Sequence, residues 1–412
     1  MILRTKYLDK IKAGFALQPI VVLIGARQVG KTSLMKIFQI EGKSLFLNGQ
    51  DPEVSDVFSK MSVAEQYLKV YLNSELKGYI LLDEFQFIPN VSTMLKLLTD
   101  KYPDLRILCS GSSSLDILAK IEESLAGRVR TIEVLSLSFE EYLLFKDVNL
   151  SKLYESFDEN TEESPLSFRI LSVWEEYLQY GGLPRAALTE NEEEKITLLD
   201  NIYKTYLLKD VRAYIANEHF IGFNKLLRLL AVQIGNLVNI NELSRETALP
   251  YKKCEEYLAL LEQMYIIKLV EPFYTNKRKV ITKMKKVYFC DLGLRNIIYA
   301  SFNEMAFRTD NGAIFENYVL LELWRKQKVG SIINFYRTVD GAEVDFVINN
   351  LIKCTAWECK YKQLDKSISI PSLTSFSNIE NISCSYIVNR NLNKKKDMTH
   401  LIPGYLIGKV QI

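Results

Sequence analysis

The sequence predicts an α/β protein whose first domain contains a parallel sheet, and three observations carry this prediction. An apolar, β-branched run over 20–24 leads directly into a glycine-rich loop and a helix. A second apolar run, over 79–82, ends in two adjacent acids, and a third, over 104–110, ends in a run of serines. Buried parallel strands have this near-continuous apolar character. Their carboxyl ends meet at one edge of the sheet, where α/β proteins bind ligands.

The composition is that of a soluble globular protein with more than one domain. The 412 residues are 48% hydrophobic and 25% charged, and this length predicts about two to three domains. The formal net charge is +2, so no global field favours nucleic acid or membranes, and any nucleic-acid surface must be local. No apolar run reaches the ~20 residues that span a bilayer, and no signal peptide opens the chain. We therefore expect a cytoplasmic protein without a membrane partner.

Cysteine and histidine usage argues against several kinds of site. The six cysteines form no C-x-x-C pair, and most lie in apolar runs. Buried, reduced thiols are therefore expected rather than disulfides or a metal site. The sequence has only two histidines, His219 and His400, which nearly excludes histidine-based zinc sites and Ser-His catalysis.

Residues 25–32, GARQVGKT, form a complete G-x-x-x-x-G-K-[ST] motif, the phosphate-binding P-loop. Gly25 and Gly30 allow a tight turn whose N–H groups suit a β-phosphate. Lys31 places a charge on the β- and γ-phosphates, and Thr32 offers a hydroxyl to Mg²⁺. A chance glycine loop would not explain the strand, the spacing, the lysine and the threonine together. The predicted nucleotide-binding residues are Gly25, Ala26, Arg27, Gln28, Val29, Gly30, Lys31, Thr32 and Ser33.

The two acids that close the run YILLDE are the second motif. Burying adjacent carboxylates at a strand end is costly without a metal ion or a reactant nearby. Beside a P-loop, Asp83 is expected to orient Mg²⁺, and Glu84 to polarise the attacking water. The alternative is a strand-end turn with two solvated acids.

Two further residues are candidates for the same site. Ser112, in the serine run after the third strand, is predicted to sense the γ-phosphate or water, with Ser110 as the alternative. A helix-capping serine run is equally compatible with these residues. Arg128 follows a glycine and could reach a phosphate in cis, or a neighbour's nucleotide in trans as an arginine finger. A surface arginine is the competing interpretation, because exposed ion pairs are common and weak.

These motifs together resemble a known group of proteins. The segments GARQVGKTSL, YILLDEFQ, LCSGSSS, GRVRTIEVLSLSFEEYL and YGGLPRA are similar to those of prokaryotic AAA-type P-loop ATPases of the archaeal ATPase kind. The resemblance implies Mg²⁺-dependent ATP hydrolysis. It also implies a C-terminal domain of unknown function that is similar to restriction-endonuclease-like folds. We therefore expect an ATPase domain with a helical lid over 1–218, including a loop over 149–166 and a long helix over 192–216.

The middle of the chain, over 219–305, predicts a winged helix-turn-helix domain, because three amphipathic helices precede a strand hairpin. Phosphate contacts from a basic wing would make DNA a partner. Against this, Glu255 and Glu256 lie on the expected recognition helix and would repel a duplex. The alternative is a charged hairpin that only bridges its neighbours. The basic residues about the expected wing are Lys277, Arg278, Lys279, Lys283, Lys285 and Lys286.

The last part, over 306–412, predicts a PD-(D/E)XK nuclease-like domain. A helix over 312–326 carries Glu316, and a strand over 342–348 alternates so that Asp345 faces away from its apolar residues. A strand over 355–361 places Glu358 and Lys360 on one face. The three carboxylates would hold Mg²⁺ or Mn²⁺ and have raised proton affinity until the ion binds, while the lysine would assist the attacking water. The alternative is that Glu358 and Lys360 lie on a solvated strand face without a metal. The tail over 391–400 is expected to be a basic loop.

The sequence thus predicts ATP binding and hydrolysis coupled to nucleic-acid binding or processing by the C-terminal domain. Two other roles remain open, a nucleotide-gated regulatory scaffold and an ATPase that acts on proteins, with a C-terminal domain that only binds partners. If Arg128 acts in trans, the active form is a homo-oligomer.

Overall fold

The structure is a computed structural model of the chain, and it describes residues 2–39, 44–111, 125–161, 165–273, 284–338, 340–350, 353–380 and 382–411. The chain divides into two compact units. The first comprises Met1–Ser136 with Gln263–Tyr265, and the second comprises Leu137–Glu262 with Ile266–Ile412. The first unit ends well before residue 218, and the three domain ranges predicted from the sequence stay a prediction.

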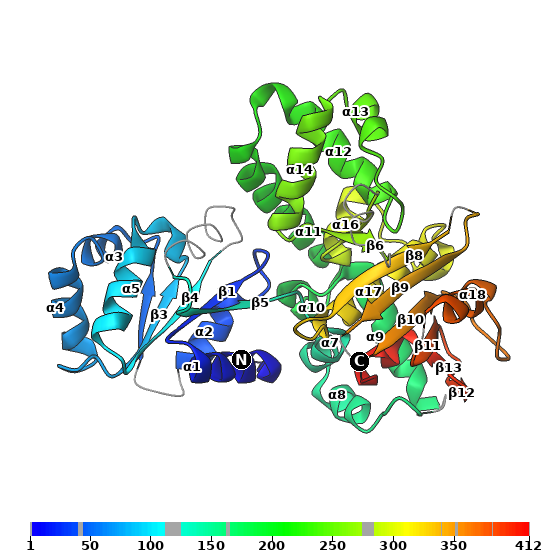
Figure 1. Ribbon diagram of the computed structural model, residues 1–412, viewed down its shortest axis with the longest axis horizontal. Coiled ribbons are helices and arrows are strands. Elements are labelled where there is room, and N and C mark those ends of the chain that lie inside the picture. Colours follow the sequence, from blue (N-terminus) through cyan, green and yellow to red (C-terminus); the bar gives the residue numbers. More distant parts are fainter. Residues whose placement is uncertain are drawn as a thin grey trace. The chain divides into compact units, whose positions relative to one another are not determined.

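The first unit is built on a five-stranded parallel sheet, as the sequence predicts (Figure 1). Its strands, in sheet order, are β2 (Ser44–Asn48), β3 (Gly78–Asp83), β4 (Leu105–Ser110), β1 (Ile20–Ile24) and β5 (Val129–Glu133). All five residues of β1 are buried, which explains their unbroken apolar run. Because β4 lies between β1 and β3, the ends of all three strands meet at one edge.

Helices cover this sheet and fix the loops at its edge. Phe15, Phe38 and Tyr79 join three elements through ring contacts with centroids 5.2–5.8 Å apart. Offset and edge-on rings of this kind add to the energy of area burial. The helices of the unit are α1 (Thr5–Leu17), α2 (Lys31–Gln39), α3 (Pro52–Val57), α4 (Met61–Tyr71) and α5 (Val91–Lys101), with a 3-10 turn at Phe85–Phe87.

The second unit begins with helices, and two of them occupy 149–155 and 165–166, so the loop predicted over 149–166 is wrong at both of its ends. Its first helices are α7 (Phe139–Lys146), α8 (Val148–Glu155), α9 (Pro165–Tyr180), α10 (Pro184–Leu188) and α11 (Glu192–Ile202). The Asp147 carboxylate caps α8 by accepting from the backbone N–H groups of Asn149 and Leu150. Leu150 and Tyr154 are buried, and these apolar contacts outweigh the polar composition of the segment.

The long helix expected over 192–216 is also interrupted. The α-helical part ends at Ile202, and the chain continues as a π-helix, Tyr203–Asp210, and a 3-10 helix, Val211–Tyr214. Changes of helix type of this kind are often found at hinges and functional sites.

The three helices and the hairpin expected over 219–305 are present. They are α12 (Phe220–Val232), α13 (Ile240–Thr247), α14 (Tyr251–Gln263), β6 (Ile267–Pro272) and β7 (Lys286–Phe289). A further helix, α16 (Leu292–Tyr299), follows β7. β6 pairs antiparallel with β7 and, at Glu271 and Pro272, parallel with β8. The hairpin is therefore part of the C-terminal sheet.

This sheet has eight strands in the order β12-β13-β11-β10-β9-β8-β6-β7 (Figure 1). The prediction of a basic loop over 391–400 is wrong, because Lys394–Lys396 and Thr399–Pro403 form paired strands. Lysines on the edge strand are typical, since they oppose pairing with another chain. The remaining elements are α17 (Asn311–Arg325), β8 (Ile332–Arg337), β9 (Glu343–Asn349), β10 (Cys354–Cys359), α18 (Pro371–Ile379), β11 (Cys384–Asn389), β12 (Lys394–Lys396), β13 (Thr399–Pro403) and a 3-10 helix, Gly404–Lys409.

The strict alternation expected in β9 is broken. Asn334 of β8 pairs with Val347, but Tyr336 pairs with Val344, so the register shifts by one residue. The extra residue is a β-bulge. It places Val344 and Val347 in one buried cluster with α18, while Phe346 contacts the Tyr288 ring. The expected common face for Val344 and Phe346 is therefore wrong.

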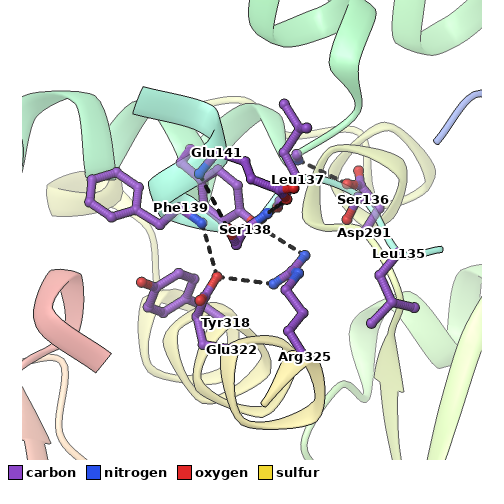
Figure 2. Close-up of polar contacts among 12 residues, drawn as sticks. Leu135, Ser136, Leu137, Ser138, Phe139, Glu141, Asp291, Tyr318, Glu322 and Arg325 are labelled. Carbon is purple, nitrogen blue, oxygen red and sulfur yellow. Dashed lines mark hydrogen bonds and ion pairs between the residues drawn. The ribbon is translucent and has the colours of Figure 1, made fainter. Parts of the chain in front are cut away.

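A buried polar junction joins α7 to the C-terminal helices (Figure 2). Ser138 and Glu141 form a capping box at the start of α7, while the Glu322 carboxylate accepts from Phe139 N at 3.0 Å and from Arg325 at 3.0 Å. A carboxylate at a helix N-terminus is stabilised by the N–H groups that the helix leaves unpaired. The junction thus orders the segment that follows the first unit in the chain.

Candidate functional site

The P-loop of the first unit encloses the Lys31 side chain. Its ammonium donates to the carbonyl oxygens of Gly25 and Ala26, both at 2.8 Å, and the residue is 6% exposed. Burial lowers the pKa of Lys31 to about 8, opposed by the nearby charges of Glu84 and Asp83. The loop therefore holds a cation among backbone carbonyl groups.

Glycine is required where the loop leaves β1. Gly25 has φ +148°, and a Cβ there would lie 2.1 Å from the carbonyl oxygen of Val134. Gln28 and Gly30 also have positive φ, at 64° and 96°. Successive residues of this kind turn backbone N–H groups toward one point, which is how anion-binding loops are made.

Thr32 and Asp83, both predicted from the sequence, meet at the end of β3. Thr32 Oγ1 donates to Asp83 Oδ2 at 2.8 Å, and Asp83 is 6% exposed. The hydroxyl of Ser110, the last residue of β4, donates to the other carboxylate oxygen and lies 3.4 Å from Glu84 N. Helix α2 and the strands β3 and β4 thus meet at one carboxylate, and a hydroxyl beside a carboxylate is a donor set that suits Mg²⁺. Ser110 is the serine at this position, while Ser112 lies outside the described residues.

Glu84 lies at the turn that follows β3, in the left-handed region with φ 51° and ψ 43°. Such a backbone conformation is uncommon for a residue other than glycine and is found at functional sites. Its carboxylate accepts from the Gln86 side-chain amide at 2.5 Å. The sequence analysis did not identify Gln86. The signal for it in the sequence was an amide side chain two residues after Glu84.

Arg4 is a second residue that sequence reasoning missed. Its guanidinium donates to the carbonyl oxygens of Val29, in the P-loop, at 2.9 Å and of Leu135 at 3.1 Å, and the residue is buried. Arg4 therefore stabilises the P-loop through a hydrogen bond to its backbone. No motif surrounds Arg4, so the sequence carries no signal for this contact.

Arg128 is not brought to the P-loop within one chain. Its carbonyl accepts from Ile20 N, at the start of β1, whereas the P-loop follows the end of that strand. Five strand residues separate the two positions by about 15 Å. The guanidinium donates to both carboxylate oxygens of Asp100, at 2.7 and 3.2 Å. The action of Arg128 in trans stays a prediction.

The nuclease-like residues of the second unit form ion pairs with groups that the sequence did not assign to them. Glu316 of α17 accepts from the Lys286 ammonium at 2.9 Å and from the Tyr288 hydroxyl at 2.5 Å. Lys286 also pairs with Glu343, and its side chain is only 2% exposed. Both Lys286 and Tyr288 come from β7, outside the range 306–412.

The other three predicted residues lie on neighbouring strands. Asp345 accepts from Cys359 N at 2.7 Å, and the Lys360 ammonium donates to Glu358 Oε1 at 2.6 Å. Burial raises the pKa of the Asp345 carboxyl well above its usual range, and the charges of Glu316 and Glu358 add to this effect. Burial also raises the pKa of Glu358, opposed by its hydrogen bond to Lys360. The raised proton affinity expected from the sequence is thus found for these two acids.

This arrangement does not fit a divalent ion. Throughout the described ranges, no group of three or more His, Cys, Asp and Glu side chains is placed to hold a metal. Within the described residues, Glu358 Oε2 is buried and has no hydrogen-bond partner. One oxygen, however, does not provide the several ligands that Mg²⁺ needs. The carboxylates are instead held by Lys286, Tyr288 and Lys360.

The expected basic wing gains no support from its described members. Lys285 pairs with Glu271 at 2.8 Å, and Lys286 is buried. Lys277, Arg278, Lys279 and Lys283 lie outside the described residues. On α14, Lys253 pairs with Glu256 at 2.6 Å. By contrast, Lys394–Lys396 are all exposed on the edge strand β12.

Two further observations concern the cysteines and the apolar helices. All six cysteines are free thiols, of which Cys109, Cys254 and Cys290 are buried and the other three partly exposed. Among the helices within the described ranges, none is long and apolar enough to cross a membrane.

Comparison with family models divides the chain into three consecutive matches. Residues 17–143 match an AAA domain family, which supports the predicted P-loop ATPase. Residues 171–304 and 311–406 match two different domains of unknown function. These two matches give the second unit no assigned activity.

Similar proteins include three that are uncharacterised. One from Methanocaldococcus jannaschii is 29% identical over 337 residues, 79% of this chain and 71% of that protein. One from Mycobacterium tuberculosis is 25% identical over 80% of this chain and 67% of its own length. One from Haemophilus influenzae is 25% identical over 84% of both chains. The solved Walker-type ATPase of Pyrococcus abyssi is 16% identical, with a TM-score of 0.49, over 72% of this chain and 96% of that one.

Proposed function

We propose that the first unit binds ATP with Mg²⁺ and hydrolyses it. The observation that carries this proposal is the Thr32–Asp83 contact at 2.8 Å, which joins the P-loop to the acid-ended strand. Lys31 would hold the β- and γ-phosphates once it releases the carbonyls of Gly25 and Ala26. The backbone N–H groups over 25–33 would surround the same phosphates.

Thr32 and Asp83 would hold the Mg²⁺ ion, directly or through water. When bound, the ion neutralises charge on the phosphates. Ser110 keeps Asp83 in place through its hydroxyl. Glu84 would accept a proton from the attacking water, and its contact with Gln86 sets the direction of the carboxylate.

Two substitutions test this assignment by separating binding from hydrolysis. In Lys31→Ala the phosphates lose their cation, so tight ATP binding should be lost. Glu84→Gln should still bind ATP and hydrolyse it about 10²–10⁴-fold more slowly, the usual contribution of a general base. Fluorescent-nucleotide titration and phosphate release measure the two steps, and undiminished turnover in Glu84→Gln would remove that residue from its role.

We further propose nucleic acid as the downstream partner, bound but not cut. The exposed Lys394–Lys396 row is the observation that favours it, because several lysines on one strand can follow a phosphate backbone. No cleavage step is derived, since the acids of the nuclease-like pattern do not fit a divalent ion. The ranges 219–305 and 306–412 have the element order of a winged helix and of a nuclease-like fold, and both classifications are part of this proposal.

The competing proposals are a nucleotide-gated scaffold and an ATPase acting on proteins. Stimulation of ATP turnover by DNA, and its loss when Lys394, Lys395 and Lys396 are all changed to Ser, would favour nucleic acid. Stimulation by a co-purified protein, with none by DNA, would favour the alternatives.

A further inference from the structure

The Lys286 ammonium contacts Glu316, one of the three acids to which the sequence pattern assigns a metal ion. The ammonium pairs with Glu316 of α17 at 2.9 Å and with Glu343 of β9. The side chain is 2% exposed, so water cannot take its place. A buried ammonium is stable only when paired carboxylates compensate its lost hydration. Two carboxylates from different elements therefore share this one cation.

The Glu316 side chain is 16% exposed, and its two oxygens have different surroundings. Oε1 accepts from Lys286 and from the Tyr288 hydroxyl at 2.5 Å. Oε2 faces the backbone of Gly235, where a Cβ would lie only 3.3 Å away. The positive φ of Gly235, 77°, and its lack of a side chain allow this close approach. At Oε1, a divalent ion would have to displace Lys286.

Each neighbouring acid also has at least one partner. Glu343 also pairs with Arg337 at 3.2 Å, Asp345 accepts from Cys359 N, and Glu358 pairs with Lys360. Lys286, Arg337 and Lys360 thus supply fixed positive charge throughout the cluster. These charges offset most of the negative charge of the acids and so weaken the attraction of the cluster for a further cation.

We propose that the Lys286 ammonium is the resident cation of this cluster and replaces the divalent ion that the nuclease-like pattern implies. The C-terminal sheet therefore does not take Mg²⁺ or Mn²⁺ at Glu316, Asp345 and Glu358. The four residues of the pattern form a metal-independent structural core that the β6–β7 hairpin completes. This proposal does not rest on the proposed ATPase activity.

Mn²⁺ binding to the full-length chain tests the proposal directly. Electron paramagnetic resonance would measure free Mn²⁺ without nucleotide, with every variant carrying Asp83→Asn so that the P-loop site does not contribute. The parent chain, which carries Asp83→Asn and retains Lys286, should bind no Mn²⁺ at micromolar concentrations. Millimolar Mg²⁺ should leave its melting temperature unchanged. Lys286→Ala should melt lower, because Glu316 loses its cation and Glu343 keeps only Arg337 among the described residues.

Divalent ions should then replace the missing ammonium. Lys286→Ala should bind one Mn²⁺ at least about tenfold more tightly than its parent, and Mg²⁺ should raise its melting temperature by about 5 °C through mass action. Adding Glu316→Gln should abolish both effects. The matched control is Lys285→Ala, which removes an adjacent, partly exposed lysine that pairs with Glu271. It should gain no ion.

Either of two results would overturn the proposal. One is stoichiometric Mn²⁺ in the chain that retains Lys286, lost on Glu316→Gln. The other is a folded Lys286→Ala chain that gains no ion. If the alanine variant does not fold, Lys286→Met keeps the bulk of the side chain and takes its place in the same measurements.

Discussion

At the scale of single residues, Lys31 connects the P-loop to the pH of the solution. Its pKa is lowered to about 8 by burial, whereas bound phosphates would raise it again. ATP binding should therefore take up a proton above pH 8 and none near pH 7. The affinity should be constant around pH 7 and fall up to about tenfold per pH unit between 8 and 10.

Isothermal titration in buffers of different ionisation enthalpy would measure this proton uptake. The same pKa also affects folding. Because the folded-state pKa lies below the usual 10.5, the unfolded chain binds more protons between pH 8 and 10.5, and Lys31 makes the protein more stable as pH rises through that range. An affinity that is flat from pH 7 to 10 would contradict the assigned environment of Lys31.

Gln86 should act on turnover through Glu84. Removing its amide in Gln86→Ala frees the Glu84 carboxylate from the contact at 2.5 Å, so kcat should fall about tenfold or more while KM for ATP stays the same. Gln86→Asn has a shorter reach and should not restore the rate. Gln66→Ala, on the exposed face of α4, is the matched control. An equal loss of ATP affinity and rate would indicate general damage to the loop instead.

At the scale of elements, the glycines of the YGGLPRA segment fix how α9 meets α16. A Cβ on Gly293 would lie 2.1 Å from the carbonyl oxygen of Tyr180, and one on Gly181 would lie 2.3 Å from Gly293 N. Asp291 reinforces this approach, since its carboxylate accepts from Gly182 N at 2.9 Å and Leu294 N at 3.1 Å. The backbones of these elements are in direct contact.

Gly293→Ala should therefore lower the free energy of unfolding by more than about 2 kcal/mol, since a backbone must move. Gly312→Ala is the control, because a Cβ there meets nothing within 4 Å in helix α17. It should stabilise by up to about 1 kcal/mol through helix propensity. Thermal or urea unfolding followed by circular dichroism measures both, and two equal effects would contradict the close approach.

The sequence predicted elements well where one local pattern decided them. The strands β1, β3 and β4 are buried on both faces and bounded by motif residues, so apolar runs located them within one residue. The sequence did not predict the elements that depend on tertiary contacts. Lys394–Lys396 form an edge strand that no apolar pattern marks, and the bulge in β9 depends on its pairing with β8.

The candidate sites show the same division. Lys31, Thr32 and Asp83 were predicted because the P-loop spacing is specific, and they are brought together. Arg4, Gln86 and Lys286 were missed or assigned elsewhere, because their roles arise from contacts between distant segments. Lys286 was assigned to a wing, and only the pairing of β6 with β8 brings its strand to the C-terminal sheet.

At the scale of the whole molecule, Arg128 and the P-loop lie at opposite ends of adjacent strands. One chain cannot bring them together, but a head-to-tail contact between two chains presents the amino end of one sheet to the carboxyl end of the next. Such heterologous contacts generate rings or filaments. Arg128 would first have to leave Asp100, and this costs little because both side chains are partly exposed and such pairs are weak in water.

If Arg128 acts in trans, Arg128→Ala should keep ATP affinity and lose about 10³-fold or more in turnover, as for other arginine fingers. Wild-type activity per chain should rise with protein concentration as subunits assemble. Mixing the inactive variants Arg128→Ala and Glu84→Gln should restore part of the activity, because some contacts then pair an intact Arg128 with an intact Glu84. Arg106→Ala, an arginine of β4 that contacts its own chain at Pro103, is the control and should change neither property. A turnover per chain that is independent of concentration, with no activity in the mixture, would leave Arg128 as a surface residue paired with Asp100.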